Sequence, residues 1–261
     1  MARATATSTL APVALPAHLE RLRVRLADGA ATTVHVATYE AASTAVRVVR
    51  LRRFEPLAAW CDRSGVDEAL IGGFFLREQS RPLGELRTRG IVRRTVPFTA
   101  PWSDVRACVH SLGGRVAIAR RPDLPASPRG DFLQAGPLLV RGGVAAFRDG
   151  EDTEGFRAGA HQFDSDITDG RHPRTALGVT ADGHILAVAA DGRAREDAGL
   201  TMTELAGVLV DLGAQDALNL DGGGSTSLVS GGILRNTPRG EWETPIPGGR
   251  PISTALVFSP R

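Results

Sequence analysis

Residues 201–226 read TMTELAGVLVDLGAQDALNLDGGGST and contain three structural signals in succession. Thr201 and Glu204 fit a capping box at the start of a helix. Four apolar side chains then follow at helical spacing, at Leu205, Val208, Leu209 and Leu212. Gly213 stands where a helix C-cap glycine belongs, and a short strand after it ends at Asp221. The stretch therefore predicts a helix and a strand that deliver a glycine-rich run to one edge of a sheet.

The chain on either side of this stretch alternates between short apolar runs and turns. Period-two patterns and β-branched residues predict strands over 22–26, 34–38, 45–51, 69–75, 90–96, 115–119, 174–180, 184–190, 217–220, 225–229, 232–234 and 252–258. Pro56 suits the first turn of a short helix. Residues 149–173 are polar and lack apolar periodicity, as is typical of a surface loop or lid. Many strands and few helices predict an α+β fold with a large mixed, mostly antiparallel sheet and a few packed helices.

The composition is that of an ordinary soluble protein. Of the 261 residues, 42% are hydrophobic and 23% charged, and 31 basic residues against 29 acidic ones leave a formal charge of +2. This near-balance indicates no nucleic acid partner. No run approaches the roughly 18 apolar residues that cross a membrane. Pro12 and Pro16 interrupt the apolar stretch near the N-terminus, so we expect no signal peptide, no membrane contact and a cytoplasmic location.

The basic residues are all arginine, since the sequence contains no lysine. Schiff-base chemistry, pyridoxal phosphate anchoring and Walker-type phosphate binding each need a lysine and are therefore excluded. Arginine remains, and its planar fork suits bidentate recognition of phosphate. Cys61 and Cys108 are too few for a disulfide framework or a zinc finger, and we expect reduced thiols.

The run Asp221–Gly222–Gly223–Gly224–Ser225–Thr226 is the strongest local signal for a ligand site. Successive glycines remove side chains where a backbone bends or touches a ligand. Successive N–H groups in such a turn form an anion-binding nest, to which the two hydroxyl residues would add donors. A hairpin turn in which the glycines only supply positive φ explains the run about equally well. Asn219 and Asp221 in the same turn favour a functional loop.

Arg174 and Thr175 begin a predicted strand directly after the polar loop. An arginine in that position would clamp a phosphate, although an ordinary surface arginine is the simpler alternative. Asp191 ends the next apolar run and precedes a glycine, as Asp221 does. Two carboxylates at matching strand ends would form the pair that glycoside cleavage uses. Aspartates before glycine most often make hairpin turns, which is the competing interpretation.

Metal ligands are less clearly indicated. The six histidines show no recognisable metal spacing, although His161 or His172 beside the polar loop would suit a proton donor or a ligand. Asp164, Asp166 and Asp169 suggest a loop for a divalent cation (Mg²⁺, Mn²⁺ or Ca²⁺), without the rest of an EF-hand pattern. The residues therefore assign no certain cofactor.

Several blocks, in order along the chain, resemble the phosphodiester glycosidase family. They are 71–75 (IGGFF), 134–137 (QAGP), 172–178 (HPRTALG), 188–193 (VAADGR), the helix over 201–212, 219–225 (NLDGGGS) and 250–253 (RPIS). The resemblance covers roughly residues 65–259, and the NLDGGGS block is its most specific part. Where the family usually carries asparagine before Gly-Gly-Phe-Phe, this chain has Ile71, a departure that bears on substrate preference.

The resemblance implies hydrolysis of a sugar-1-phosphodiester at the anomeric carbon–oxygen bond, with release of the sugar and a phosphomonoester. The expected cytoplasmic location favours a small sugar-phosphate or a nucleotide sugar as the substrate. The expected site comprises the catalytic residues Asp221, Asp191 and Arg174 and the substrate-binding residues Gly72, Gly73, Thr175, Asn219, Gly222, Gly223, Gly224, Ser225 and Thr226. We expect the phosphate to contact Arg174, Thr175 and the glycine amides, and the two carboxylates to stabilise an oxocarbenium-like transition state. The chain would divide into a loose tail over 1–17, a β-rich extension over 18–64 and the catalytic domain over 65–261.

Two other functions stay open, and the sequence indicates no oligomeric state. A metal-dependent phosphodiesterase would cut the phosphorus–oxygen bond with ligands from Asp164, Asp166, Asp191 or Asp221, and would lose activity in a chelator. A non-catalytic sugar-phosphate binding module would bind the same ligands without releasing a product.

Overall fold

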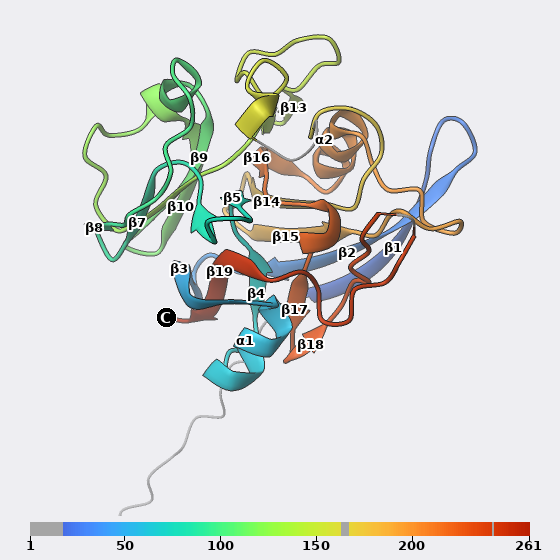
Figure 1. Ribbon diagram of the computed structural model, residues 1–261, viewed down its shortest axis with the longest axis horizontal. Helices are drawn as coiled ribbons and strands as arrows, with labels where there is room; N and C mark the ends of the chain where they lie inside the picture. The colour runs from blue at the N-terminus through green and yellow to red at the C-terminus, as the bar shows by residue number, and fades with distance from the viewer. Residues whose placement is uncertain (1–17, 163–166, 242) are drawn as a thin grey trace, which may run out of the picture.

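The computed structural model describes residues 18–162, 167–241 and 243–261 (Figure 1). Its strands form one seven-stranded sheet, two five-stranded sheets and a two-stranded ribbon. Every pairing between these strands is antiparallel. The α+β class and its mostly antiparallel character are confirmed, with the strands divided over several sheets.

The seven-stranded sheet runs in the order β1 (His18–Arg25), β2 (Ala31–Tyr39), β15 (Ile185–Ala190), β14 (Arg174–Thr180), β16 (Ala214–Asn219), β12 (Leu138–Arg141) and β13 (Val144–Ala145). Its register brings three strand ends together. Arg174 at the start of β14 lies opposite Ala190 at the end of β15, and Ala176 lies opposite Asn219 at the end of β16. The segments that follow β15 and β16 therefore leave the sheet at the same edge.

A five-stranded sheet runs in the order β18 (Ile233–Leu234), β17 (Leu228–Ser230), β4 (Ala69–Ile71), β19 (Ile252–Pro260) and β3 (Thr44–Glu55). The strand predicted over 69–75 breaks after β4. At Gly72 a Cβ atom would lie 2.5 Å from the Oγ1 atom of Thr254, so only glycine allows β19 to approach this closely. The chain then forms the ribbon of β5 (Phe75–Leu76) and β6 (Arg81–Pro82).

The other five-stranded sheet runs in the order β10 (Arg115–Arg120), β9 (Ala107–Leu112), β11 (Asp131–Gln134), β7 (Leu86–Thr88) and β8 (Ile91–Val92). The strands β9, β11 and β12 were not expected from the sequence, and the strand predicted over 90–96 is reduced to β8. The described ranges contain no helix with the length and apolar character needed to cross a membrane.

Two helices complete the layers visible in Figure 1. Helix α2 (Met202–Asp211) has both hydrogen bonds of the predicted capping box, from the Glu204 amide to the Thr201 hydroxyl at 3.1 Å and from the Thr201 amide to the Glu204 carboxylate at 2.9 Å. Its apolar side packs on the seven-stranded sheet. Helix α1 (Leu57–Ser64) packs on the sheet that contains β4 and β19.

The main core lies between the sheets. Strand β15 shows how the sequence produces it: Ile185, Ala187 and Ala189 belong to this core, whereas Leu186, Val188 and Ala190 belong to the cluster beneath α2. A strand that is buried on both faces is apolar throughout, and this explains its uninterrupted ILAVAA sequence. The 18–64 segment joins both layers, because β2 pairs with β15 and β3 pairs with β19.

Candidate active site

A cleft opens at the sheet edge where the start of β14 meets the segments that follow β15 and β16. Its cavity volume is about 100 Å³, so it is a small, solvent-open cleft. Its charged lining consists of four arginines and two carboxylates, at Arg77, Arg174, Arg193, Arg250, Asp221 and Glu241. The predicted residues Asn219, Asp221, Gly222, Gly223, Gly224 and Ser225 also line it, as do Phe74 and Phe75. The cleft therefore combines an apolar wall with a concentration of positive charge.

Asp221 is positioned through its backbone. Its amide donates to the Gly72 carbonyl at 3.1 Å, and the amide of the preceding Leu220 donates to the Thr175 carbonyl at 2.9 Å. The side chain of Thr175 is fully buried and does not line the cleft. The predicted residues Gly72 and Thr175 thus belong to the site as supports of Asp221, and the expected phosphate contact of Thr175 is wrong.

The carboxylate of Asp221 lies in a partly buried, cationic environment. It accepts the amide of Gly222 at 2.9 Å and a hydrogen bond from the Ser225 side chain. Burial raises the pKa of Asp221 to about 6, against the opposing effect of these hydrogen bonds and of Arg250 and Arg77. Asp221 therefore changes protonation state close to neutral pH, as groups in catalytic sites often do.

Two glycine amides of the run, those of Gly222 and Gly223, bind within the protein and are not available to the anion-binding nest that the sequence suggested. The Gly222 amide binds the preceding carboxylate, and the Gly223 amide donates to the Pro173 carbonyl at 2.8 Å. The amides of Ser225 and Thr226 donate to the carbonyls of Gly222 and Gly223, both at 3.1 Å, and close a short 3-10 turn. The expected phosphate contact through the amides of Gly222 and Gly223 is therefore wrong, because these donors are used within the protein.

Two guanidinium groups lie against the same glycines, and the closer approach is at Gly224. A Cβ atom on Gly223 would lie 3.5 Å from the terminal nitrogens of Arg193, and one on Gly224 would lie 3.0 Å from Nη2 of Arg250 and 2.9 Å from Cδ1 of Ile246. Gly223 also has a positive φ of 58°. Arg193 itself has a φ of 56°, which is uncommon for a residue with a side chain and occurs most often at functional sites.

Three of the arginines act on one another electrostatically. Burial lowers the pKa of Arg193, the charge of Glu241 opposes this effect, and the charge of Arg77 adds to it. Burial, followed by Arg77 and then Arg193 among its causes, lowers the pKa of Arg250, while Asp221 and Glu241 oppose this effect. Partly buried cations that repel one another gain most from an anion placed between them. This cluster therefore indicates a phosphate-binding position.

Arg174 is committed to the protein backbone. It is 3% exposed, and its Nε, Nη1 and Nη2 atoms donate to the carbonyls of Leu200, Ile167 and Gly170 at 2.9, 2.6 and 3.1 Å. These bonds attach the segment around 167–170 to the mouth of the cleft. The expectation that Arg174 clamps the phosphate is therefore corrected, and we assign that role to Arg193 and Arg250.

Asn219 presents an acceptor that has no hydrogen-bond partner among the described residues. Its Nδ2 atom donates to the Gly136 carbonyl at 3.0 Å, and its backbone is bound on both sides by the 136–137 segment. Its buried Oδ1 atom accepts no hydrogen bond from any described residue. The predicted residue Thr226 also has a buried hydroxyl without a described partner, but it does not line the cleft. Buried polar atoms without partners are uncommon, and at a cleft they indicate a ligand or ordered water.

Two residues of the first sequence block have structural roles. Gly73 donates its amide to the Thr254 hydroxyl at 3.0 Å and does not line the cleft. Ile71, which replaces the asparagine usual in related sequences, is fully buried in the cluster beneath α1. Because its side chain is not part of the cleft lining, this departure leaves the charged groups of the cleft intact.

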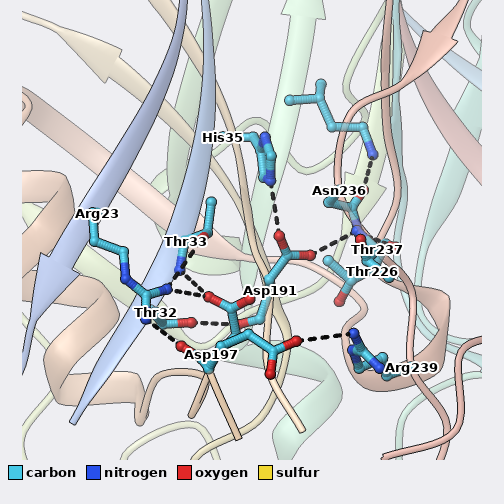
Figure 2. Close-up of polar contacts among 12 residues, drawn as sticks. Arg23, Thr32, Thr33, His35, Asp191, Asp197, Thr226, Asn236, Thr237 and Arg239 are labelled. Atoms are coloured by element: carbon cyan, nitrogen blue, oxygen red, sulfur yellow. Dashed lines mark hydrogen bonds and ion pairs between the residues drawn. The ribbon is translucent and has the colours of Figure 1, made fainter. Parts of the chain in front are cut away.

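Asp191 does not line the cleft, so the expected pairing of Asp191 and Asp221 across it is corrected. Figure 2 shows the Asp191 carboxylate between His35 and Thr237, with His35 Nε2 at 2.9 Å and the Thr237 amide at 2.7 Å. Asp191 is 5% exposed, and its backbone carbonyl accepts the Thr32 hydroxyl. Beside Thr237, Asn236 donates to the Thr226 carbonyl at 2.8 Å. Asp191 therefore anchors the segment that follows the glycine run.

Sequence reasoning missed the roles of Arg77, Arg193, Arg250 and Glu241. Two of these residues lie inside quoted blocks, directly after Asp191–Gly192 and directly before Pro251, but nothing in the local pattern shows where an arginine side chain points. His172 also lines the cleft, and burial followed by the charges of two arginines lowers its pKa to about 4. At neutral pH it is therefore uncharged, and its Nδ1 atom lies 3.3 Å from Arg193 Nη2 as an acceptor.

The residues predicted for a divalent cation are only partly described. Asp164 and Asp166 lie outside the described residues, whereas Asp169 is within them. In the described part of the chain, no group of three or more histidine, cysteine, aspartate or glutamate side chains is arranged to hold a metal ion. Cys61 and Cys108 are both free and buried, as expected.

Two curated proteins are similar to this chain in sequence. The mouse N-acetylglucosamine-1-phosphodiester alpha-N-acetylglucosaminidase is 29% identical over 207 residues, which make up 76% of this chain and 38% of the mouse protein. An uncharacterized SPbeta prophage-derived protein of Bacillus subtilis is 34% identical over 71 residues, 27% of this chain and 11% of its own. The chain thus spans less than half the length of these curated relatives.

Solved structures share the fold. The zebrafish N-acetylglucosamine-1-phosphodiester alpha-N-acetylglucosaminidase catalytic domain, auto-inhibited by its pro-peptide, has a TM-score of 0.69 at 20% identity and covers 94% of this chain and 83% of its own. A hypothetical protein from Synechocystis has a TM-score of 0.63 at 20% identity, with 93% and 62% covered. The family model for phosphodiester glycosidase matches residues 64–259, and the chain therefore belongs to the phosphodiester glycosidase family.

Proposed function

We propose that the protein is a hydrolase that cleaves a sugar-1-phosphodiester at its anomeric carbon–oxygen bond and releases the sugar and a phosphomonoester. The observation that carries this proposal is the gathering of Arg77, Arg193 and Arg250 around Asp221 in one cleft. The guanidinium groups suit the charge of a phosphodiester, and the carboxylate suits the positive charge that develops on the sugar.

In the proposed reaction the phosphate lies against Arg193 and Arg250, with Arg77 at the rim. As the anomeric carbon–oxygen bond breaks, its electron pair moves to the bridging oxygen, and the phosphate gains a second negative charge. Donors that meet this added charge stabilise the transition state more than the bound substrate, which is the requirement for catalysis. Arg193 and Arg250, which lie against the glycine run, are therefore assigned to bind the phosphate of the leaving group.

Asp221 acts as a carboxylate in this scheme, stabilising the oxocarbenium-like sugar. Water adds to the anomeric carbon and loses its proton, and Glu241, the other carboxylate in the cleft lining, is assigned to accept it. Asn219 Oδ1, which has no partner among the described residues, is assigned to accept a sugar hydroxyl. The apolar wall beside it is formed by Phe74 and Phe75.

The name of the mouse relative points to N-acetylglucosamine as the first sugar to test. Nucleotide sugars belong in the same panel, because they carry the same anomeric carbon–oxygen–phosphorus linkage. No cofactor has a part in this scheme, and the metal-dependent alternative is an outcome of the experiment below.

The test is product analysis by phosphorus and proton NMR on such a panel, with and without chelator. We expect free sugar and a phosphomonoester from at least one compound, at equal rates in both conditions. Asp221→Asn should lower turnover by more than about 100-fold, whereas Asp211→Asn, the same substitution at an exposed position at the end of α2, should not change it. Turnover lost in chelator and restored by Mg²⁺ or Mn²⁺ would instead support a metal-dependent phosphodiesterase. Binding without product would support a non-catalytic module.

A further inference from the structure

A second groove runs along the edge strand β3, beside β7 and β8. Five arginines line it, three from β3 (Arg47, Arg50, Arg52) and two from the β7–β8 segment (Arg89, Arg93). Figure 1 shows β7 and β8 beyond β3 on the same side of the molecule as the C-terminus. β3 is the last strand of its sheet, so the groove lies at the edge of that sheet, between β3 and the sheet that contains β7 and β8.

The groove carries positive charge that the protein does not neutralise. Its acidic lining residue is Asp131, which is 3% exposed and accepts the amides of Val48 and Arg89 with its two oxygens. Its charge is therefore already engaged by the backbone.

The arginine side chains of the groove are mostly unpaired. Within the described ranges, the exposed side chains of Arg47, Arg50, Arg52 and Arg89 make no hydrogen bond or ion pair, and only Arg93 has a polar partner, the Thr88 hydroxyl. Carboxylates elsewhere are paired with other arginines, such as Glu55 with Arg63, Glu85 with Arg87 and Arg121, and Glu204 with Arg171. The formal charge of the whole chain is only +2. The groove is therefore a local concentration of positive charge.

The strand that lines the groove ends at the wall of the candidate active site. Strand β3 ends with Phe54–Glu55, and the Phe54 ring packs edge-on against the Phe75 ring with centroids 5.1 Å apart. Phe75 lines the cleft. From Arg47 to Phe54 the strand rises over about 20 Å. The unpaired arginines of β3 therefore span more than one repeat unit of a flexible phosphodiester chain, and the end of the same strand contacts the wall of the cleft through Phe54.

We propose that this groove binds a polyanionic, phosphodiester-linked chain attached to the scissile phosphate, so that the substrate is the end of a sugar-phosphate polymer. This inference rests on the proposed function of the cleft. Exposed guanidinium groups bind successive phosphates through bidentate, charge-assisted hydrogen bonds. Binding of single-stranded nucleic acid also needs exposed aromatic faces for the bases. The groove lining contains one aromatic residue, Trp60, which is 9% exposed, so a chain without bases fits better.

The test is direct binding of fluorescently labelled poly(glycerol phosphate) of about ten units, which has phosphodiester links but no sugar-1-phosphate to cleave. The triple variant Arg50→Gln, Arg52→Gln, Arg89→Gln should weaken binding about tenfold, since each exposed charge contact contributes roughly two- to threefold. The matched control removes three exposed charges that lie outside the groove and make no polar contact with any described residue, in Arg21→Gln, Arg25→Gln, Arg115→Gln. It should weaken binding less than about twofold.

Turnover of a small sugar-1-phosphodiester should be the same in both triple variants and in the parent protein. Equal weakening in the two triple variants would overturn the proposal, because binding would then follow net charge alone. No binding to the parent protein, or tighter groove-dependent binding of a single-stranded oligonucleotide of equal charge, would also overturn it. Since the binding assay does not depend on turnover, failure of the groove and failure of the proposed reaction are distinguished.

Discussion

Replacing Asp191 separates a structural role from a catalytic one. Its carboxylate binds His35 at 2.9 Å and the Thr237 amide at 2.7 Å in a buried setting (Figure 2). Alanine would leave both partners buried without it, and each such group costs about 1–3 kcal/mol. We therefore expect Asp191→Ala to lower the free energy of unfolding by about 2–6 kcal/mol, a large share of the roughly 5–15 kcal/mol typical of a whole domain.

Asparagine at the same position keeps one oxygen for the Thr237 amide and a similar shape. We expect Asp191→Asn to lower the free energy of unfolding by about 1 kcal/mol. Because Asp191 does not line the cleft, turnover should stay within about tenfold of the parent protein, whereas removal of a general acid or base costs about 10²–10⁴-fold.

The assay combines urea unfolding followed by circular dichroism with turnover of a small sugar-1-phosphodiester. Asp221→Asn serves as the matched control, because it is the same substitution inside the cleft. If Asp191→Asn lost as much turnover as Asp221→Asn while its unfolding curve matched that of the parent, Asp191 would take part in the chemistry. The structural role derived from Figure 2 would then be refuted.

Four further outcomes follow from the site. In the proposed reaction Asp221 acts as a carboxylate, and its pKa is raised to about 6. The specificity constant kcat/KM should therefore rise with pH through about 6 and then level off. A fall through that range would contradict the role of Asp221. Burial of the ionised form also destabilises the fold above that pH. Asp221→Asn should therefore raise the free energy of unfolding at pH 8 by about 1–3 kcal/mol, and the gain should vanish below pH 4. Arg193→Gln should lower kcat/KM by more than about 100-fold with little change in the free energy of unfolding. Arg174→Gln should instead lower the free energy of unfolding by about 2–4 kcal/mol, and urea titrations of the two variants measure this difference. Gly224→Ala should displace the Arg250 guanidinium and raise KM for the phosphodiester, and an unchanged KM would show that the close approach is unimportant.

Local patterns predicted the parts of the fold that local physics determines. The capping box of α2 and the β1–β2 hairpin depend on neighbouring residues, and both are present close to the expected bounds. Strand β9 was missed because its sequence, ACVHSL, mixes polar and apolar residues without a clear period. Strand β4 is shorter than expected, and the close approach at Gly72 of β19, which is remote in sequence, could not be predicted from a local pattern.

The candidate site was predictable in position but not in detail. The glycine run and Asp221 do line the cleft. The partner of Asp191, however, is His35, which lies 156 residues away and reaches it through the pairing of β2 with β15. Such contacts depend on strand register across the whole sheet, which a local pattern does not contain. The amides of the glycine run likewise could not be known to be occupied until the Pro173 carbonyl was placed beside them.

The central claim is that the bond cleaved is the anomeric carbon–oxygen bond, and hydrolysis in oxygen-18 water tests it most directly. The products of a sugar-1-phosphodiester would be separated, and mass spectrometry and the isotope shift in the phosphorus NMR spectrum would locate the label. We predict oxygen-18 in the released sugar and none in the phosphomonoester, because water adds to the sugar carbon next to Asp221. Label in the phosphate would place the attack at phosphorus and contradict the assigned roles of Asp221 and Glu241.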